Sequence, residues 1–296
     1  MCGIIGYVGH QQAAPILLDG LARMEYRGYD SAGVAVRSET KGLQVYKSKG
    51  RLQVLSDMIH GGADVEGTLG IGHTRWATHG EPNDINAHPH VSEDGRIAMV
   101  HNGIIENYME IKQQLLRHGV KFKSETDTEV VAQLLEFHYR ECHNMLEAVG
   151  RVLRRIEGSY AFGIICADYP NALIAARKDS PMVIGIADGE SYLASDVPAI
   201  LKYTRNVYYI GNLELARLQK GKVTFFNLDG DEIQKDLVEI TWNAEAAEKA
   251  GFEHFMMKEI HEQPKAVRDT LNSILHDGVI DLQTMGLTEE EMRDTQ

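Results

Sequence analysis

Short apolar runs with the character of β-strands place the strongest limit on how this chain can fold. Two of them, Tyr160–Ala167 and Ala172–Ala176, contain the stretches AFGIICA and ALIAA, without the polar alternation of a half-exposed strand. Strands of this kind are typical of sheets that are covered on both faces. We therefore expect buried sheets with layers of helices outside them.

Helix and strand candidates do not alternate strictly along the chain, as they would in a parallel βαβ fold. Strands are predicted at Gly3–Gly9, Gly33–Arg37, Leu43–Ser48, Gly70–Ala77, Ile97–His101, Tyr160–Ala167, Ala172–Ala176, Val183–Ala187, Tyr192–Ser195, Val207–Ile210 and in a late hairpin through Lys222–Leu228 and the Asp229–Gly230 turn. Helices are predicted at Ala13–Met24, Arg51–Ile59, Asn107–His118, Glu129–Arg140 and Leu146–Ile156, the last with Gly158 as its C-terminal stop. The pattern predicts an α+β fold, a four-layer α/β/β/α sandwich of two mostly antiparallel sheets.

The charge of the chain changes along its length. Residues 231–296 hold 16 Asp and Glu against 6 Lys and Arg and supply −10 of the net charge of −13, whereas residues 1–230 are nearly neutral. We predict a large domain over residues 1–240, a polar linker over 241–254 and the truncated start of a second domain over 255–296. In that last part Phe255–Leu275 is expected to be helical, with Pro264 as a kink or restart. Charge alone does not distinguish a solvated acidic tail from an interface.

The composition argues against several kinds of partner and location. An acidic chain lacks the basic face that nucleic acid requires, and it gives no reason to expect an anionic membrane surface as a partner. The three cysteines, Cys2, Cys142 and Cys166, form no CxxC pair, which argues against disulfides and against a Cys-based zinc site. Neither a signal-like start nor an apolar run of membrane-spanning length is present, so a cytoplasmic protein is expected.

Cys2 is the candidate nucleophile. Initiator methionine is removed readily before a small residue such as cysteine, which would leave Cys2 with both a thiol and a free α-amine. Such an amine has a pKa of about 7.7–8.0 and can accept the proton of the thiol, whose ionised form is the reactive species. A cysteine at position 2 is by itself more often incidental. Here it stands in MCGIIG, directly before a predicted strand that would hold the terminus rigidly.

Five further polar stretches lie between the predicted strands, where loops usually carry binding groups. They are EYRGYDSAG (25–33), HTRWATHGEP (73–82), NAHPHVS (86–92), HNGIIEN (101–107) and SETDTEV (124–130). Together with MCGIIG, this ordered set resembles the glutaminase domain of the glutamine–fructose-6-phosphate aminotransferases (glucosamine-6-phosphate synthases), class II glutamine amidotransferases of the N-terminal-nucleophile hydrolase superfamily. The resemblance covers about residues 1–240, and KEIHEQP (258–264) is similar to the start of that family's sugar-phosphate isomerase domain.

The resemblance implies a reaction and the residues that perform it. Cys2 would attack the side-chain amide of L-glutamine, and the side chain of Asn102 with the backbone N–H of Gly103 would form the oxyanion hole. Removing one such donor typically costs about 2.7–4 kcal/mol in the barrier. An Asn-Gly pair alone is more often a turn, but this one follows the predicted strand Ile97–His101 without an obvious antiparallel partner directly after it.

Other family positions would bind the two charged ends of glutamine. The resemblance implies that Arg75 holds the α-carboxylate through two parallel hydrogen bonds, with Thr78 and His79 beside it. It also implies that Asp127 neutralises the ammonium group. The alternative for Arg75 is an ordinary surface ion pair.

Several of these positions also have a purely structural interpretation. Thr126 and Glu129 fit a capping box at the start of a helix, a role that is compatible with ammonium binding by Asp127. Trp76 resembles the family residue that gates the passage of ammonia, and its alternative is an ordinary half-buried aromatic. Arg27 resembles the family arginine near the nucleophile, and its alternative is a cation at a helix end.

Histidines are concentrated in one part of the chain. Five of them fall within 29 residues, at His73, His79, His88, His90 and His101. Their spacing fits no common structural zinc pattern and no cysteine joins them. We expect them to form hydrogen bonds and to shape the glutamine pocket, with no metal and no cofactor.

The implied function is hydrolysis of L-glutamine through a thioester on Cys2. In the full-length enzyme, which the resemblance implies is a homodimer, the ammonia would convert fructose 6-phosphate to glucosamine 6-phosphate. Fructose 6-phosphate would bind only through the missing isomerase domain. Two alternatives stay open. One is a related amidotransferase with another acceptor, such as those making phosphoribosylamine or asparagine, although TRWATHG and HNGIIEN match the sugar enzyme better. The other is a catalytically silent glutamine-binding fragment.

Overall fold

The computed structural model describes residues 2–241, 251–276 and 279–280. The chain divides into two compact units, Met1–Thr241 and Trp242–Gln296, which are described separately. None of the described helices is long and apolar enough to cross a membrane.

The first of two large sheets has eight strands, and every neighbouring pair in it is antiparallel. Its strand order is β15-β11-β9-β10-β1-β4-β2-β3. β1 (Gly3–Val8) is an inner strand between β10 and β4, and it is buried along its whole length. The other strands are β2 (Ser31–Ser38), β3 (Gly42–Lys49), β4 (Leu69–Arg75), β9 (Val183–Ala187), β10 (Glu190–Ala194), β11 (Asn206–Tyr209) and β15 (Val238–Glu239).

The second large sheet has seven strands and is also antiparallel throughout. Its order is β14-β13-β12-β8-β7-β6-β5. The strands are β5 (His90–Val91), β6 (Ile97–Ile105), β7 (Gly158–Cys166), β8 (Leu173–Lys178), β12 (Glu214–Gln219), β13 (Lys222–Phe226) and β14 (Glu232–Ile233). The predicted late hairpin corresponds to β13 and β14.

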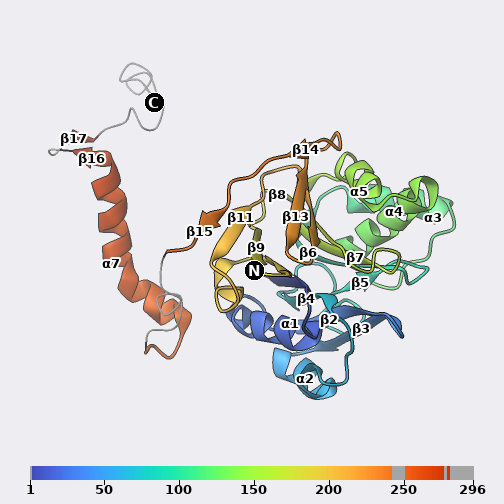
Figure 1. The fold of residues 1–296 in the computed structure, drawn as a ribbon, viewed down its shortest axis with the longest axis horizontal. Coiled ribbons are helices and arrows are strands. Elements are labelled where there is room, and N and C mark those ends of the chain that lie inside the picture. Colours follow the sequence, from blue (N-terminus) through green and yellow to red (C-terminus); the bar gives the residue numbers. More distant parts are fainter. Residues whose placement is uncertain (1, 242–250, 277–278, 281–296) are drawn as a thin grey trace. The chain divides into compact units, whose positions relative to one another are not determined.

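Helices cover the outer faces of the two sheets (Figure 1). α1 (Ala13–Ala22) packs on β1 and β4 of the first sheet, and α2 (Leu52–Met58) lies beside it. On the second sheet, α4 (Asp127–Cys142) contacts β5 and β6, and it is flanked by α3 (Tyr108–Arg117) and α5 (Met145–Leu153). The layers are therefore helix, sheet, sheet and helix.

The continuous apolar run of β7 follows from its place between two cores. Ala161 and Ile165 belong to the apolar cluster between the sheets. Phe162 and Ile164, which point to the other face of the strand, belong to the cluster under α3, α4 and α5. Both faces are buried, so no polar alternation is needed, as the sequence predicts.

The predicted helix stop at Gly158 is wrong. α5 ends at Leu153, and Gly158 is the first residue of β7. Its φ is +112°, and a Cβ at this position would lie 2.2 Å from Ile104 O. Glycine is required there by the close approach of β6. Among the strands of the first unit, β12 and the two-residue strands β5 and β15 have no counterpart among the predicted strands.

The described part of the second unit contains one long helix. α7 (Phe255–Ile274) continues through Pro264 without a restart, and a short pair of strands follows, β16 (Leu275–His276) and β17 (Val279–Ile280). Most of the predicted linker and the last sixteen residues lie outside the described residues.

Candidate active site

Cys2 lies immediately before β1, at the edge of the buried part of the first sheet. Gly3 pairs with Thr74 of β4. On the opposite side, Ile4 N–H donates to Ser195 Oγ at 2.9 Å and Ser195 N–H donates to Ile4 O at 3.0 Å. Residue 2 is therefore held between two neighbouring segments of the sheet. Ser195, which directly follows β10, is a contributor that the sequence analysis did not single out.

The Cys2 thiol is partly buried against the main chain of Trp76. Trp76 N–H donates to Cys2 Sγ at 3.2 Å, and the thiol lies 3.6 Å from Trp76 O. Burial raises the pKa of the Cys2 thiol, and the Trp76 N–H and the charges of Arg75 and Arg27 partly oppose that rise. In the described part of the chain, the hydrogen bonds of Sγ go to Trp76 alone, so no neighbouring side chain takes its proton directly.

The segment after β4 is bent around the sulfur by Asp30. β4 ends at Arg75, two residues before the predicted end, because Trp76 N–H points to Cys2 and Ala77 N–H donates to Asp30 Oδ2 at 2.9 Å. Asp30 N–H in turn donates to Arg75 O at 3.0 Å. Asp30 lies in EYRGYDSAG, and its role depends on a contact 47 residues away that no local pattern specifies.

Asn102 and Gly103 do not form a turn. Both lie inside β6, which extends to Ile105 and pairs with β7 along its length. Asn102 Nδ2 donates to Cys2 O at 3.1 Å, which brings this side chain to the nucleophile. Gly103 has a φ of +132°, and a Cβ there would lie 2.0 Å from Ser159 O. Only glycine fits this position without strain.

Asp127 is the first residue of α4 and is buried. Its Oδ2 accepts the N–H of Ile105 at 2.9 Å, whereas among the described residues Oδ1 has only a long contact of 3.5 Å with Thr128 Oγ1. Thr126 caps the helix by accepting Glu129 N–H, as predicted. The return half of the capping box is absent in the described structure, since the Glu129 carboxylate instead accepts backbone N–H groups of residues 123 and 124.

Arg75 binds the loop that follows it. Nη2 donates to His79 O and to Gly80 O, the latter at 3.2 Å, and Nη1 donates to Glu81 O at 3.4 Å. Burial lowers the pKa of Arg75. Thr78 from this loop lines the cavity beside Cys2. The His79 ring instead lies edge-on to Tyr108, with 5.5 Å between ring centroids.

Two further predicted residues flank the nucleophile. Trp76 is about half exposed and meets Tyr29 edge to face, with 5.7 Å between ring centroids. Arg27 is buried, and its Nη1 lies 3.0 Å from Asp196 Oδ2. Asp196, the residue after Ser195, is another contributor that the sequence analysis missed.

Four of the five clustered histidines are buried together near Cys2. The His73 and His88 rings stack with centroids 4.2 Å apart, and His88 meets His90 edge to face. Burial lowers the pKa of all four buried rings, which also include His101. Within the residues that the structure describes, no group of three or more His, Cys, Asp or Glu side chains is arranged to hold a metal ion.

The predicted residues converge on one small cavity. It has a volume of about 20 Å³, which is room for about one water molecule. Six of the predicted site residues line it: Cys2, Arg75, Trp76, Thr78, Gly103 and Asp127. A thiol, a carboxylate and a guanidinium line the same cavity. These groups are suited to binding an amino acid with an amide side chain. Side chains or the loop after Trp76 have to move before such a molecule can enter.

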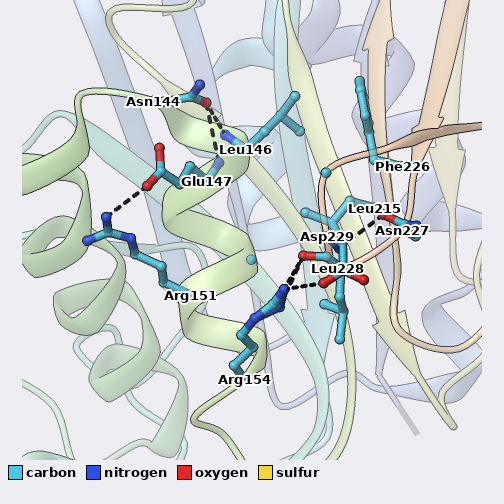
Figure 2. A pocket seen from close by; sticks show the side chains of 12 residues that line it. Asn144, Leu146, Glu147, Arg151, Arg154, Leu215, Phe226, Asn227, Leu228 and Asp229 are labelled. Carbon is cyan, nitrogen blue, oxygen red and sulfur yellow. Dashed lines mark hydrogen bonds and ion pairs between the residues drawn. The ribbon is translucent and has the colours of Figure 1, made fainter.

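A larger cavity of about 500 Å³ lies elsewhere, between α5 and the β13–β14 turn (Figure 2). None of the predicted site residues lines it. Its arginines are paired within the wall: Arg154 donates to Leu228 O and Asp229, and Arg151 pairs with Glu147. Asn144 accepts the first N–H groups of α5. The polar groups of this wall therefore satisfy one another.

Comparison with known proteins identifies the class to which this fold and site belong. The family described as "Glutamine amidotransferase domain" matches residues 44–224. The chain therefore belongs to the class II glutamine amidotransferases.

Curated relatives narrow this class. Glutamine–fructose-6-phosphate aminotransferase (isomerizing) of Caldanaerobacter subterraneus subsp. tengcongensis is 55% identical over 293 residues, which cover 99% of this chain and 48% of the relative. The protein of the same name from Thermus thermophilus is 51% identical over 284 residues, which cover 95% of this chain and 46% of the relative. The chain spans about half the length of the curated relatives it matches.

A solved structure confirms the predicted fold class. Glutamine phosphoribosylpyrophosphate amidotransferase from B. subtilis, complexed with ADP and GMP, superposes with a TM-score of 0.66 at 26% identity. The match covers 78% of this chain and 50% of that one. Two antiparallel sheets between helix layers, of the N-terminal-nucleophile hydrolase type, are thus common to both.

Proposed function

We propose that this chain hydrolyses L-glutamine through a γ-glutamyl thioester on Cys2. The observation that carries the proposal is that Cys2 and the Asp127 carboxylate line one cavity while the Asn102 amide donates to Cys2 O, in a chain of the glutamine amidotransferase family. Removal of Met1 frees the α-amine of Cys2. This amine accepts the thiol proton, and the thiolate attacks the amide carbon of glutamine.

The tetrahedral intermediate then collapses with loss of ammonia. The leaving nitrogen takes the proton from the Cys2 amine, and the acyl group stays on sulfur as a thioester. Water attacks the thioester, giving glutamate and restoring the thiol. Asn102 Nδ2 and Gly103 N–H donate to the oxygen that becomes negative, where a fixed donor stabilises the transition state more than the ground state.

The two charged ends of glutamine bind on the other walls of the cavity. Asp127 Oδ1, whose contact with Thr128 is long, accepts the ammonium group, while Oδ2 stays bonded to Ile105. Arg75 binds the carboxylate with Thr78 and His79, exchanging some of its bonds to the loop carbonyls for bonds to the ligand. Arg27 lies near the thiol and supports its ionised form.

In the complete protein, the ammonia would aminate fructose 6-phosphate to give glucosamine 6-phosphate. The support is the name shared by the curated relatives, with which the chain aligns over nearly all of its length. The second unit would lead into the isomerase part, Trp76 would gate the ammonia path, and the complete protein would act as a homodimer in the cytoplasm. Phosphoribosylpyrophosphate as acceptor is the alternative suggested by the structural likeness, at the lower identity of 26%.

Glutamate release by the processed chain tests this function directly. Cys2→Ala should abolish release and leave the fold intact, since a small side chain at the end of a strand leaves no large cavity. Cys166→Ala, which removes a buried thiol far along the sequence, is the matched control and should retain activity. Near-normal glutaminase activity of Cys2→Ala would show that Cys2 is not the nucleophile. A processed wild-type chain that binds glutamine without releasing glutamate would favour the silent-fragment alternative.

A further inference from the structure

The carboxamide of Asn102 is held from both ends. Its Nδ2 donates to Cys2 O at 3.1 Å, and its Oδ1 lies 3.0 Å from His73 Nε2. A backbone carbonyl can only accept, so the NH2 end of the amide has to face Cys2 and the oxygen has to face His73. The two partners together define one of the two possible orientations of the amide.

His73 can donate a hydrogen bond to Asn102 Oδ1 in only one neutral tautomer. Its Nε2 lies 3.0 Å from Asn102 Oδ1 and also 3.0 Å from His101 O, and both of these atoms are acceptors. Nε2 therefore carries the hydrogen. Nδ1 is buried and has no hydrogen-bond partner in the described part of the chain. Burial also lowers the pKa of His73 to about 3, so the ring stays neutral at physiological pH.

The position of the His73 ring is fixed by the sheet and by a second histidine. His73 belongs to β4 and pairs with Ile4 of β1 on one side and with Gly33 of β2 on the other. The ring of His88 stacks on it with a centroid distance of 4.2 Å and an angle of 28° between planes. The ring therefore has little freedom to turn its N–H away from Asn102.

We propose that His73 is a positioning residue that selects the orientation of Asn102 in which an N–H, rather than the carbonyl oxygen, faces the reacting amide. This inference rests on the proposed glutaminase function. If the Asn102 amide turned over, Oδ1 would point toward the developing negative oxygen and repel it. His73 need not touch glutamine, because it acts through Asn102. It fixes the Asn102 amide, which is the side-chain donor of the oxyanion hole, in one orientation.

The test is a double-mutant cycle measured on chains shown by intact mass to begin at Cys2. His73→Leu should lower kcat about 10- to 100-fold, with KM for glutamine within about threefold, because the lost interaction acts in the transition state. His73→Gln places an amide N–H near the former Nε2 and should recover most of the loss. In the Asn102→Ala background, His73→Leu should add little, since its target is gone.

His90→Leu is the matched control. It also removes a buried imidazole, but His90 Nε2 bonds to Thr126 Oγ1 and not to Asn102. Its effect on kcat should therefore be additive with that of Asn102→Ala. An additive effect for His73→Leu as well, or a rise in KM with kcat unchanged, would overturn the inference.

A second measurement does not depend on activity. Long-range proton–nitrogen NMR of the imidazoles should show His73 as the Nε2–H tautomer between about pH 6 and 8. A chain that releases glutamate but carries the Nδ1–H tautomer would overturn the His73 inference alone. A processed wild-type chain with the Nε2–H tautomer and no glutamate release would overturn the proposed function, and with it this role of His73.

Discussion

Lowering the pH from about 7.5 to about 5.5 should destabilise this fold, because three histidines are buried in it without charge. His73, His88 and His90 are each at most 5% exposed. Burial lowers the pKa of all three, that of His73 to about 3 and those of the other two well below the ordinary value. Each ring also lies near Arg75, whose positive charge opposes protonation further.

The sign follows from the two states of the chain. An unfolded histidine has a pKa of about 6.5, so below that pH the unfolded chain binds protons that the folded chain does not. The stability contributed by the neutral histidines is therefore fully present well above pH 6.5 and is lost as the pH falls below it. Between about pH 6.5 and 5.5 each histidine accounts for a loss of about 1 kcal/mol, and the three together for about 3 kcal/mol. The free energy of unfolding of a typical domain is about 5–15 kcal/mol, so a loss of about 3 kcal/mol is large.

Urea denaturation at three pH values measures this loss. The free energy of unfolding should fall steeply below about pH 6.5. His90→Gln should remove about one third of the loss that the three histidines cause together, so the unfolding free energy should depend less steeply on pH. His60 is the control, because it is exposed and Asp64 raises its pKa. Its contribution has the opposite sign, so His60→Gln should leave the acid loss equal or steeper. A free energy that is constant over this range, or a slope that His90→Gln does not change, would refute the reasoning.

Three further outcomes follow from the proposed function. Asp127→Asn should raise KM for glutamine far more than Asn102→Ala, which should lower kcat instead; equal effects of both variants on both constants in steady-state kinetics would contradict the assignment. A homogeneous sample that retains Met1 should fold but be nearly inactive, and activity should scale with the processed fraction seen by intact mass spectrometry. Calorimetry should detect no binding of fructose 6-phosphate to this chain, whose residues 255–296 have no Gly/Ser/Thr-rich phosphate loop; saturable binding would show that interpretation of the tail to be wrong.

The sequence predicts a strand correctly where turn residues mark both of its ends. It does not predict a strand whose extent depends on pairing with neighbouring strands. Val183–Ala187 is predicted with the bounds that β9 has, because an apolar run there is closed by turn residues on both sides. β12 is interrupted by polar residues and depends on β8 and β13 for its pairing, so its sequence alone gives a weak signal. Gly158 was misinterpreted because the same residue type ends helices and permits close strand contacts.

The residues of the candidate site were predictable, but their partners were not. The motifs name Cys2, Asn102 and Asp127, and the structure places them around one cavity or in direct contact. The orientation of Asn102 depends on His73, which lies 29 residues earlier and on the other sheet. Such a contact arises only when two sheets pack face to face, and no spacing rule within one strand can specify it.

Burial of the site also limits which group can act as the base for Cys2. Burial raises the pKa of the thiol, and the same burial lowers the pKa of His73 and His88. A buried imidazole of this kind is a poor acceptor for the proton of a thiol that is itself harder to ionise. An α-amine with an ordinary pKa of about 7.7–8.0 is a better match, and it belongs to the same residue as the thiol. Under the proposed mechanism, the four-layer fold therefore leaves proton acceptance to the terminus, and removal of Met1 becomes the step that makes the site competent.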